Sequence, residues 1–153
     1  MSDDNTIHVG SEPKVRRVGA YLFGEAGSGG MCERFINAWP VDLPATAAAA
    51  KTQAYRITRD VFGGGDPFEE CSLIVCTYGR QWQLQADGSL WGYTGIQGVG
   101  NGAQVGMGAA RAATRYGACP REALREGLRQ SASLCLGVKG PFDFVSLGEV
   151  PRG

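Results

Sequence analysis

The segment Cys71-Ser72-Leu73-Ile74-Val75-Cys76-Thr77-Tyr78 is a nearly continuous apolar run. It is too short and too rich in β-branched residues for a helix, and it lacks the alternation of a strand with one face in water. We therefore expect a central β-strand that is covered on both faces.

The rest of the chain predicts paired strands and paired helices around this run. Further strands are expected at residues 14–18, 21–23, 81–85, 89–93 and 142–147, with a turn at 24–30 and a hairpin about 86–88. Helices are expected from Ser28 to Pro40, from Pro44 to the glycines at 63–65, from Gly102 to Tyr116 and from Pro120 to Cys135. Because strands and helices do not alternate strictly, the order predicts an α+β layered fold and not a doubly wound parallel sheet.

Apolar residues share one face on the helix after Gly102 and form the expected inner face of the helix after Pro120. A helical period joins Val105, Ala109, Ala112 and Tyr116 on one helix. The same period joins Leu124, Leu128, Ser131 and Cys135 on the next.

Length and charge limit the class of protein. The 153 residues fit one domain over 1–153, and 15 basic residues balance 15 acidic ones. A neutral chain is not expected to bind nucleic acid or an anionic membrane. No run reaches the ~20 apolar residues of a membrane helix, and the polar start at Met1 has no signal-peptide character, so a cytoplasmic protein is expected.

Metal and cofactor sites are not expected. The chain has five cysteines, one histidine and no C-x-x-C pair, so its thiols are expected to be buried and reduced. Residues 98–103 match the pattern G-x-G-x-x-[GA] but lack the surrounding βαβ unit of a dinucleotide site, which favours a tight turn. His8 lies in a polar segment without a G-x-S-x-G motif, so a serine-histidine triad is not expected.

Three segments in order resemble the proteasome β-subunit superfamily, and most of all the bacterial HslV-type peptidases and their phage-encoded relatives. These segments are Pro13-Lys14-Val15-Arg16-Arg17, Gly24-Glu25-Ala26-Gly27-Ser28-Gly29 before one helix, and Gly98-Val99-Gly100-Asn101-Gly102 before another. The resemblance continues through residues 120–124 to the expected last strand near Phe144. It implies a four-layer αββα sandwich of the N-terminal-nucleophile hydrolase type, shortened at its N-terminus.

The resemblance also assigns roles to single residues. In the family an N-terminal threonine attacks the peptide carbonyl, and its own α-amine serves as the base. The family's buried lysine, which lowers the pKa of that amine, corresponds to Lys14, and the oxyanion-hole N–H corresponds to Gly27. Asn101 stands where the family has a serine that hydrogen-bonds the amine.

Two further residues are expected to bind substrate, Glu25 and Ser28. Glu25 corresponds to the base of the pocket for the side chain before the cleaved bond, where a carboxylate favours a cationic side chain. The alternative is that Glu25 turns outward and pairs with a neighbour such as Arg34.

The sequence departs from the family at its start. The family's nucleophile lies on a hairpin before the Lys14 segment, and no nucleophile stands in that position here. Removal of Met1 would expose Ser2, but Ser2 lies only twelve residues before Lys14, which is too few for the hairpin and its return. Two hypotheses stay open: a threonine-peptidase-family subunit that is inactive in this form, or a non-enzymatic assembly or phage virion subunit with the same fold.

The resemblance implies partners and a location as well. We expect a homo-oligomeric ring, for which the small-residue helix at 45–61 and the helix after Gly102 offer flat surfaces. An unfoldase ATPase or other phage or bacterial assembly proteins are the further partners implied. The implied location is the bacterial host cytoplasm or a phage virion.

Overall fold

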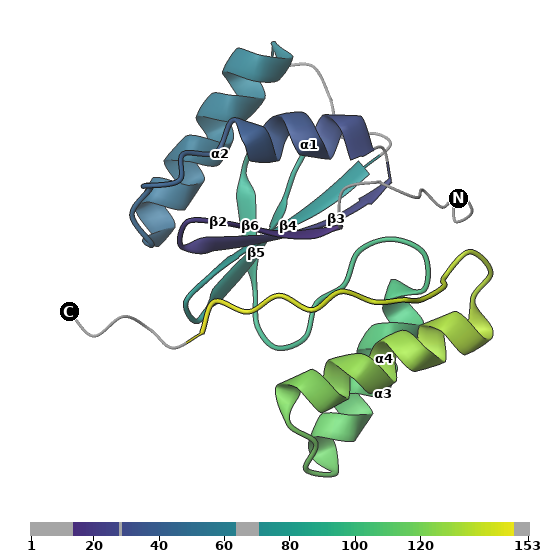
Figure 1. Ribbon diagram of the computed structural model, residues 1–153. Helices are drawn as coiled ribbons and strands as arrows, with labels where there is room; N and C mark the ends of the chain where they lie inside the picture. Colours follow the sequence, from purple (N-terminus) through teal and green to yellow (C-terminus); the bar gives the residue numbers. More distant parts are fainter. Residues whose placement is uncertain (1–13, 28, 64–70, 149–153) are drawn as a thin grey trace. The chain divides into compact units, whose positions relative to one another are not determined.

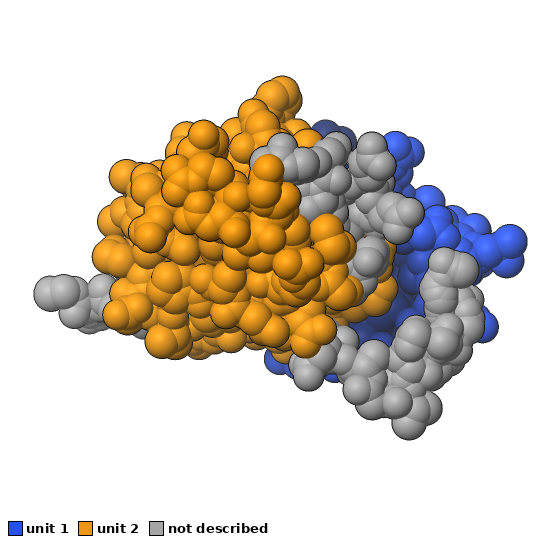
Figure 2. All heavy atoms as spheres, turned by 90° about the horizontal axis from the view of Figure 1, so that it is seen from above, with its two compact units in different colours: residues 1–12, 95–143 blue, residues 13–94, 144–153 orange. Residues whose placement is uncertain are grey.

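The computed structural model describes residues 14–27, 29–63 and 71–148. The chain divides into two compact units, which Figure 2 distinguishes by colour. The sheet unit comprises residues 13–94 and 144–153, and the helix-pair unit comprises residues 1–12 and 95–143. Among the described residues, no helix is long and apolar enough to cross a membrane.

The sheet unit contains a five-stranded antiparallel sheet in the order β2-β3-β4-β5-β6 (Figure 1). Its strands are β2 (Val15–Val18), β3 (Tyr21–Gly27), β4 (Cys71–Thr77), β5 (Arg80–Leu84) and β6 (Leu90–Tyr93). The apolar run of the sequence forms β4, the middle strand, so the prediction of a central strand is confirmed. Leu73 and Val75 are fully buried, and burial raises the pKa of the Cys76 thiol on the opposite face to about 11.

Two helices, α1 (Gly29–Asn37) and α2 (Ala47–Phe62), lie on one face of this sheet (Figure 1). Trp39, just after α1, is the aromatic centre of the core, with ring centroids 5.1 Å from Tyr21 and 5.2 Å from Phe23 in edge-on geometry. Ala50 and Ala54 are fully buried in the same core. These two small side chains therefore serve packing within the chain.

The start of α2 differs from the expected position. Pro44 does not begin the helix, because Thr46 caps it with a side-chain oxygen that accepts the Ala49 N–H at 3.2 Å. The buried Tyr21 hydroxyl donates to the Pro44 carbonyl at 2.6 Å. This bond holds Pro44 in the connection before the helix.

The helix-pair unit is built from α3 (Ala103–Arg115) and α4 (Pro120–Leu134), which pack against each other (Figure 1). The buried stripe of α4 is Ala123, Gly127 and Ser131. Leu124, expected on the inner face, is 42% exposed. Ser131 is buried as expected, but in the first two turns the stripe lies one residue earlier than expected, because close contact between the two backbones requires small side chains.

Two other expectations at the ends of elements were wrong. The segment from Gly24 to Gly27 continues β3 instead of forming a turn, because these residues pair with residues 71–74 of β4. Residues 142–147 form no strand in the described chain, although Phe142 and Phe144 alternate with exposed positions. Alternating apolar and polar residues are typical of a strand with one solvent-exposed face, but a strand also needs a neighbouring backbone with which to form hydrogen bonds. The α+β class itself is confirmed.

Candidate functional site

Three of the expected site residues lie at one end of the sheet. Lys14 directly precedes β2, and Glu25 and Gly27 lie at the end of β3. Because the two strands are antiparallel, the start of one meets the end of the other. The Glu25 N–H donates to the Lys14 carbonyl at 2.9 Å and fixes this register. The Lys14 side chain is exposed.

Gly27 ends β3 and leads toward α1. Its φ of +95° lies in the left-handed region that favours glycine. A strand-to-helix turn of this kind places backbone N–H groups near the positive end of a helix dipole, where a developing oxyanion is stabilised. Ser28, the other residue expected in this turn, lies outside the described residues.

Glu25 is half-buried and lies on the same face of the sheet as Phe23, since alternate residues of a strand share a face. This is the face that carries the aromatic core. Arg34, considered above as a partner for Glu25, is held elsewhere: its Nη2 donates to the Val61 carbonyl at 3.3 Å, and its guanidinium lies 5.3 Å from the centre of the Phe62 ring. The side chain of Arg34, a residue of α1, thus contacts the C-terminal end of α2.

Asn101 belongs to the helix-pair unit, in the loop before α3. Its Nδ2 donates to the carbonyl of Leu136, after α4. The buried Ser131 hydroxyl donates to the neighbouring Gly102 carbonyl at 2.9 Å. The Asn101 Oδ1 is the acceptor of this side chain and is therefore the atom that can receive a hydrogen bond from an amine.

Arg16 was not singled out as a site residue from the sequence, although two nitrogens of its guanidinium group are buried. Its Nε and Nη2 are buried, and neither has a hydrogen-bond partner among the described residues. By contrast, the exposed Arg17 donates from Nε to the Gly19 carbonyl at 3.0 Å. The available signal was the Arg-Arg pair itself: in a strand, two successive side chains point to opposite faces, so one of them must meet the core.

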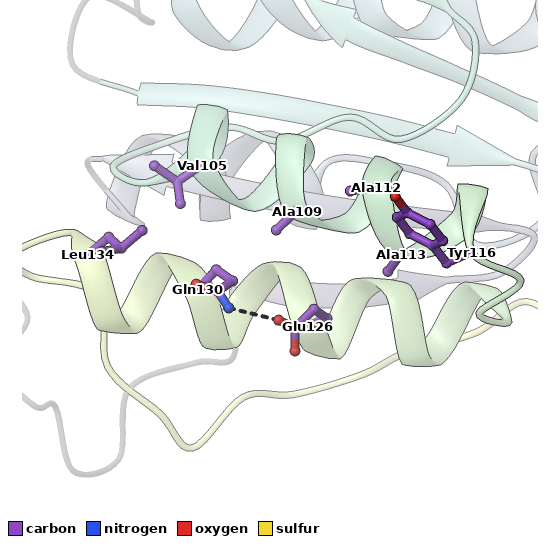
Figure 3. A pocket seen from close by; sticks show the side chains of 8 residues that line it. All are labelled: Val105, Ala109, Ala112, Ala113, Tyr116, Glu126, Gln130 and Leu134. Atoms are coloured by element: carbon purple, nitrogen blue, oxygen red, sulfur yellow. Dashed lines mark hydrogen bonds between the residues drawn. The ribbon is translucent and has the colours of Figure 1, made fainter.

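A groove of about 370 Å³ runs along the helix pair (Figure 3). Small and apolar side chains of α3 form one wall, as the helical period predicted, and Tyr116 closes its end. On α4 the wall is partly polar, since Gln130 donates to Glu126 at 2.8 Å. Tyr116 is 92% exposed and Leu134 is 69% exposed, so this face presents apolar surface to solvent.

Comparison with solved structures identifies the fold. Eukaryotic HslV from Trypanosoma brucei matches with a TM-score of 0.64 and 22% identity, over 84% of this chain and 77% of that one. BPH from Thiobacillus denitrificans, in complex with epoxomicin, matches with a TM-score of 0.65 and 15% identity, over 87% and 77%. Anbu, the ancestral beta-subunit from Yersinia bercovieri, gives 0.61 and 14%, over 88% and 70%.

The chain has the proteasome β-subunit fold. A scan against models of known protein families gives no match, and neither does a search of the curated proteins. The proteasome β-subunit fold is therefore recognised from the arrangement of the elements and from short motifs, at a sequence identity of 22% or less to these structures.

Proposed function

We propose that this chain is a subunit of the proteasome and HslV-like threonine-peptidase family and that the 153-residue form does not itself hydrolyse peptides. The observation that carries this proposal is the proteasome β-subunit fold with Lys14 and Gly27 brought to the same end of one sheet. In that position Gly27 supplies an N–H for an oxyanion, and Lys14 supplies a positive charge.

The proposed inactivity has a chemical reason. The family's reaction needs a hydroxyl and an adjacent α-amine that takes its proton. Lys14 and Gly27 assist such a pair but cannot replace it. The exposed position of the Lys14 side chain supports the same conclusion, because water screens its charge and weakens its effect on the pKa of any amine nearby.

We assign Glu25 to substrate recognition when a nucleophile is present. Glu25 lies two residues before Gly27 and is half-buried, so its carboxylate favours a lysine or arginine side chain over an acidic one. Asn101 is assigned to hydrogen-bonding the amine because it stands where the resemblance places the family's serine, and its Oδ1 is an acceptor.

We further propose that the subunit assembles with copies of itself into a closed ring. The apolar surface along the helix-pair groove supports assembly, since monomeric proteins rarely expose several large apolar side chains together. Tyr116 and Leu134, which line this groove, are 92% and 69% exposed. A non-enzymatic assembly subunit would form the same ring. Peptidase activity therefore distinguishes a peptidase subunit from an assembly subunit only when a nucleophile is supplied.

The activity prediction can be checked with fluorogenic peptides that end in leucine, arginine or glutamate. The purified 153-residue protein is expected to release fluorophore at the rate of the buffer alone, and Ser2→Ala is expected to change nothing. An enzyme-dependent rate that Ser2→Ala abolishes would contradict the proposal and identify Ser2 as the nucleophile. A rate that survives Ser2→Ala but vanishes in Lys14→Ala would also contradict it, because a different nucleophile would then be at work.

A further inference from the structure

We propose that Arg16 forms a binding site for a carboxylate, and that the carboxylate is carried by an extended peptide. The proposal is independent of peptide hydrolysis. It begins from the two buried nitrogens that have no hydrogen-bond partner in the described part of the chain, Nε and Nη2. These two atoms belong to the same edge of the planar guanidinium, so their N–H groups point in one direction as a fork.

The position of Arg16 in the sheet explains why its Nε and Nη2 atoms are buried. Arg16 is opposite Phe23, and Val18 is opposite Tyr21, so all four side chains share the face that carries the aromatic core. The stem of the arginine can pack against apolar side chains there. Its two donors, however, have lost water and have gained no acceptor, and this arrangement lowers the stability of the ligand-free protein.

The charges around Arg16 select the kind of ligand. Lys14 lies two residues before it on the same face, and Glu25 lies opposite Lys14. Neither Nε nor Nη2 of Arg16 is hydrogen-bonded to Glu25. The two cations attract an anion, while the Glu25 carboxylate repels a second negative charge. A planar monoanion therefore fits better than a doubly charged phosphate, and a carboxylate matches the fork with two parallel hydrogen bonds.

The place of β2 in the sheet indicates how the carboxylate arrives. In the described sheet β2 is an end strand, paired with β3 on one side. The backbone groups on the other side of an end strand can pair with another extended chain. A peptide that adds in this way places alternate side chains over the face that carries Arg16. The proposed ligand is thus an acidic side chain, or the terminal carboxylate, of an extended segment.

The stability of two arginine variants gives the first test. Arg16→Met keeps the apolar stem and removes the unpaired donors, so we expect its thermal unfolding temperature to rise by about 2–5 °C in the ligand-free protein. Arg17→Met is the control, because Arg17 is exposed and bonded to Gly19; it is expected to show no rise. A fall for Arg16→Met would show that Arg16 serves the fold, and it would overturn the proposal.

Binding gives the second test. The probe is the capped peptide acetyl-Thr-Val-Glu-Val-Thr-amide, titrated to millimolar concentration while the Nε–H resonance of Arg16 is followed by NMR. We expect that resonance to shift, and we expect the affinity to fall at least tenfold when glutamine replaces the peptide glutamate or in Arg16→Met. Arg17→Met should bind as the original chain does.

A third peptide, acetyl-Thr-Val-Gln-Val-Thr with a free C-terminus, distinguishes the two sources of the carboxylate. If only this peptide shifts the resonance, the site takes a chain terminus; if only the glutamate peptide does, it takes a side chain. The absence of any shift with both peptides, or equal affinity in Arg16→Met, would overturn the proposal.

Discussion

Replacement of Gly19 by valine is expected to lower the free energy of unfolding by about 3 kcal/mol or more. Gly19 lies in the turn between β2 and β3 with a φ of +55°, where a β-branched side chain is strained. A Cβ at this position would also lie 1.9 Å from the Val41 carbonyl oxygen, a backbone atom that cannot rotate away. Chemical denaturation followed by circular dichroism measures the loss.

Gly79→Ala is the matched control for this variant. Gly79 has a φ of +69°, but a Cβ there would meet nothing within 4 Å. It is expected to lose about 1 kcal/mol, the conformational part alone. Equal losses for Gly79→Ala and Gly19→Val would contradict the packing of Val41 against the turn that joins the two strands of the candidate site.

Gly127→Val is expected to lower the free energy of unfolding by about 3 kcal/mol, because it forces α3 and α4 apart. A Cβ on Gly127 would lie 2.5 Å from the Gly106 carbonyl oxygen and 3.1 Å from the Ala110 Cβ. The separation also strains the Ser131 bond to the Gly102 carbonyl, which positions the Asn101 loop. Thermal unfolding measures the first effect, and the amide resonance of Gly102 reports the second.

The control for the helix pair is Gly108→Ala on α3. A Cβ at Gly108 would meet nothing within 4 Å, so the substitution is expected to gain about 1 kcal/mol from helix propensity. A Gly127→Val protein as stable as the original would show that the two backbones are not in the close contact described.

Much of the sheet could be predicted from the sequence because its signals are local. The unbroken apolar run at 71–78 marks the middle strand, and the alternation about Asp87-Gly88 marks the β5–β6 hairpin. The last expected strand was wrong, since pairing depends on a distant backbone that alternation at Phe142 and Phe144 cannot reveal. Ser131 was predicted correctly on the inner face of α4, but the first two turns were displaced by one residue because periodicity favours leucine, whereas the contact with Gly106 requires glycine at 127.

The candidate site was predictable only in part. The motifs place Lys14 and Gly27, and the antiparallel register then brings them to one end of the sheet. That Lys14 is exposed, and that the amide of Asn101 is bonded to Leu136, depends on tertiary structure that no short motif contains. Strand alternation could have predicted that Arg16 or Arg17 lies on the core face. That the buried donors of Arg16 lack an acceptor among the described residues depends on the tertiary packing.

The molar mass of the purified 153-residue protein, measured by light scattering at micromolar concentration, tests the proposed ring subunit most directly. A ring of identical subunits buries one surface of each chain against a different surface of the next and stops growing when it closes. We therefore predict a single species with a mass that is a whole-number multiple, greater than one, of the mass of one chain and that does not change with further concentration. A mass equal to that of one chain would contradict the account.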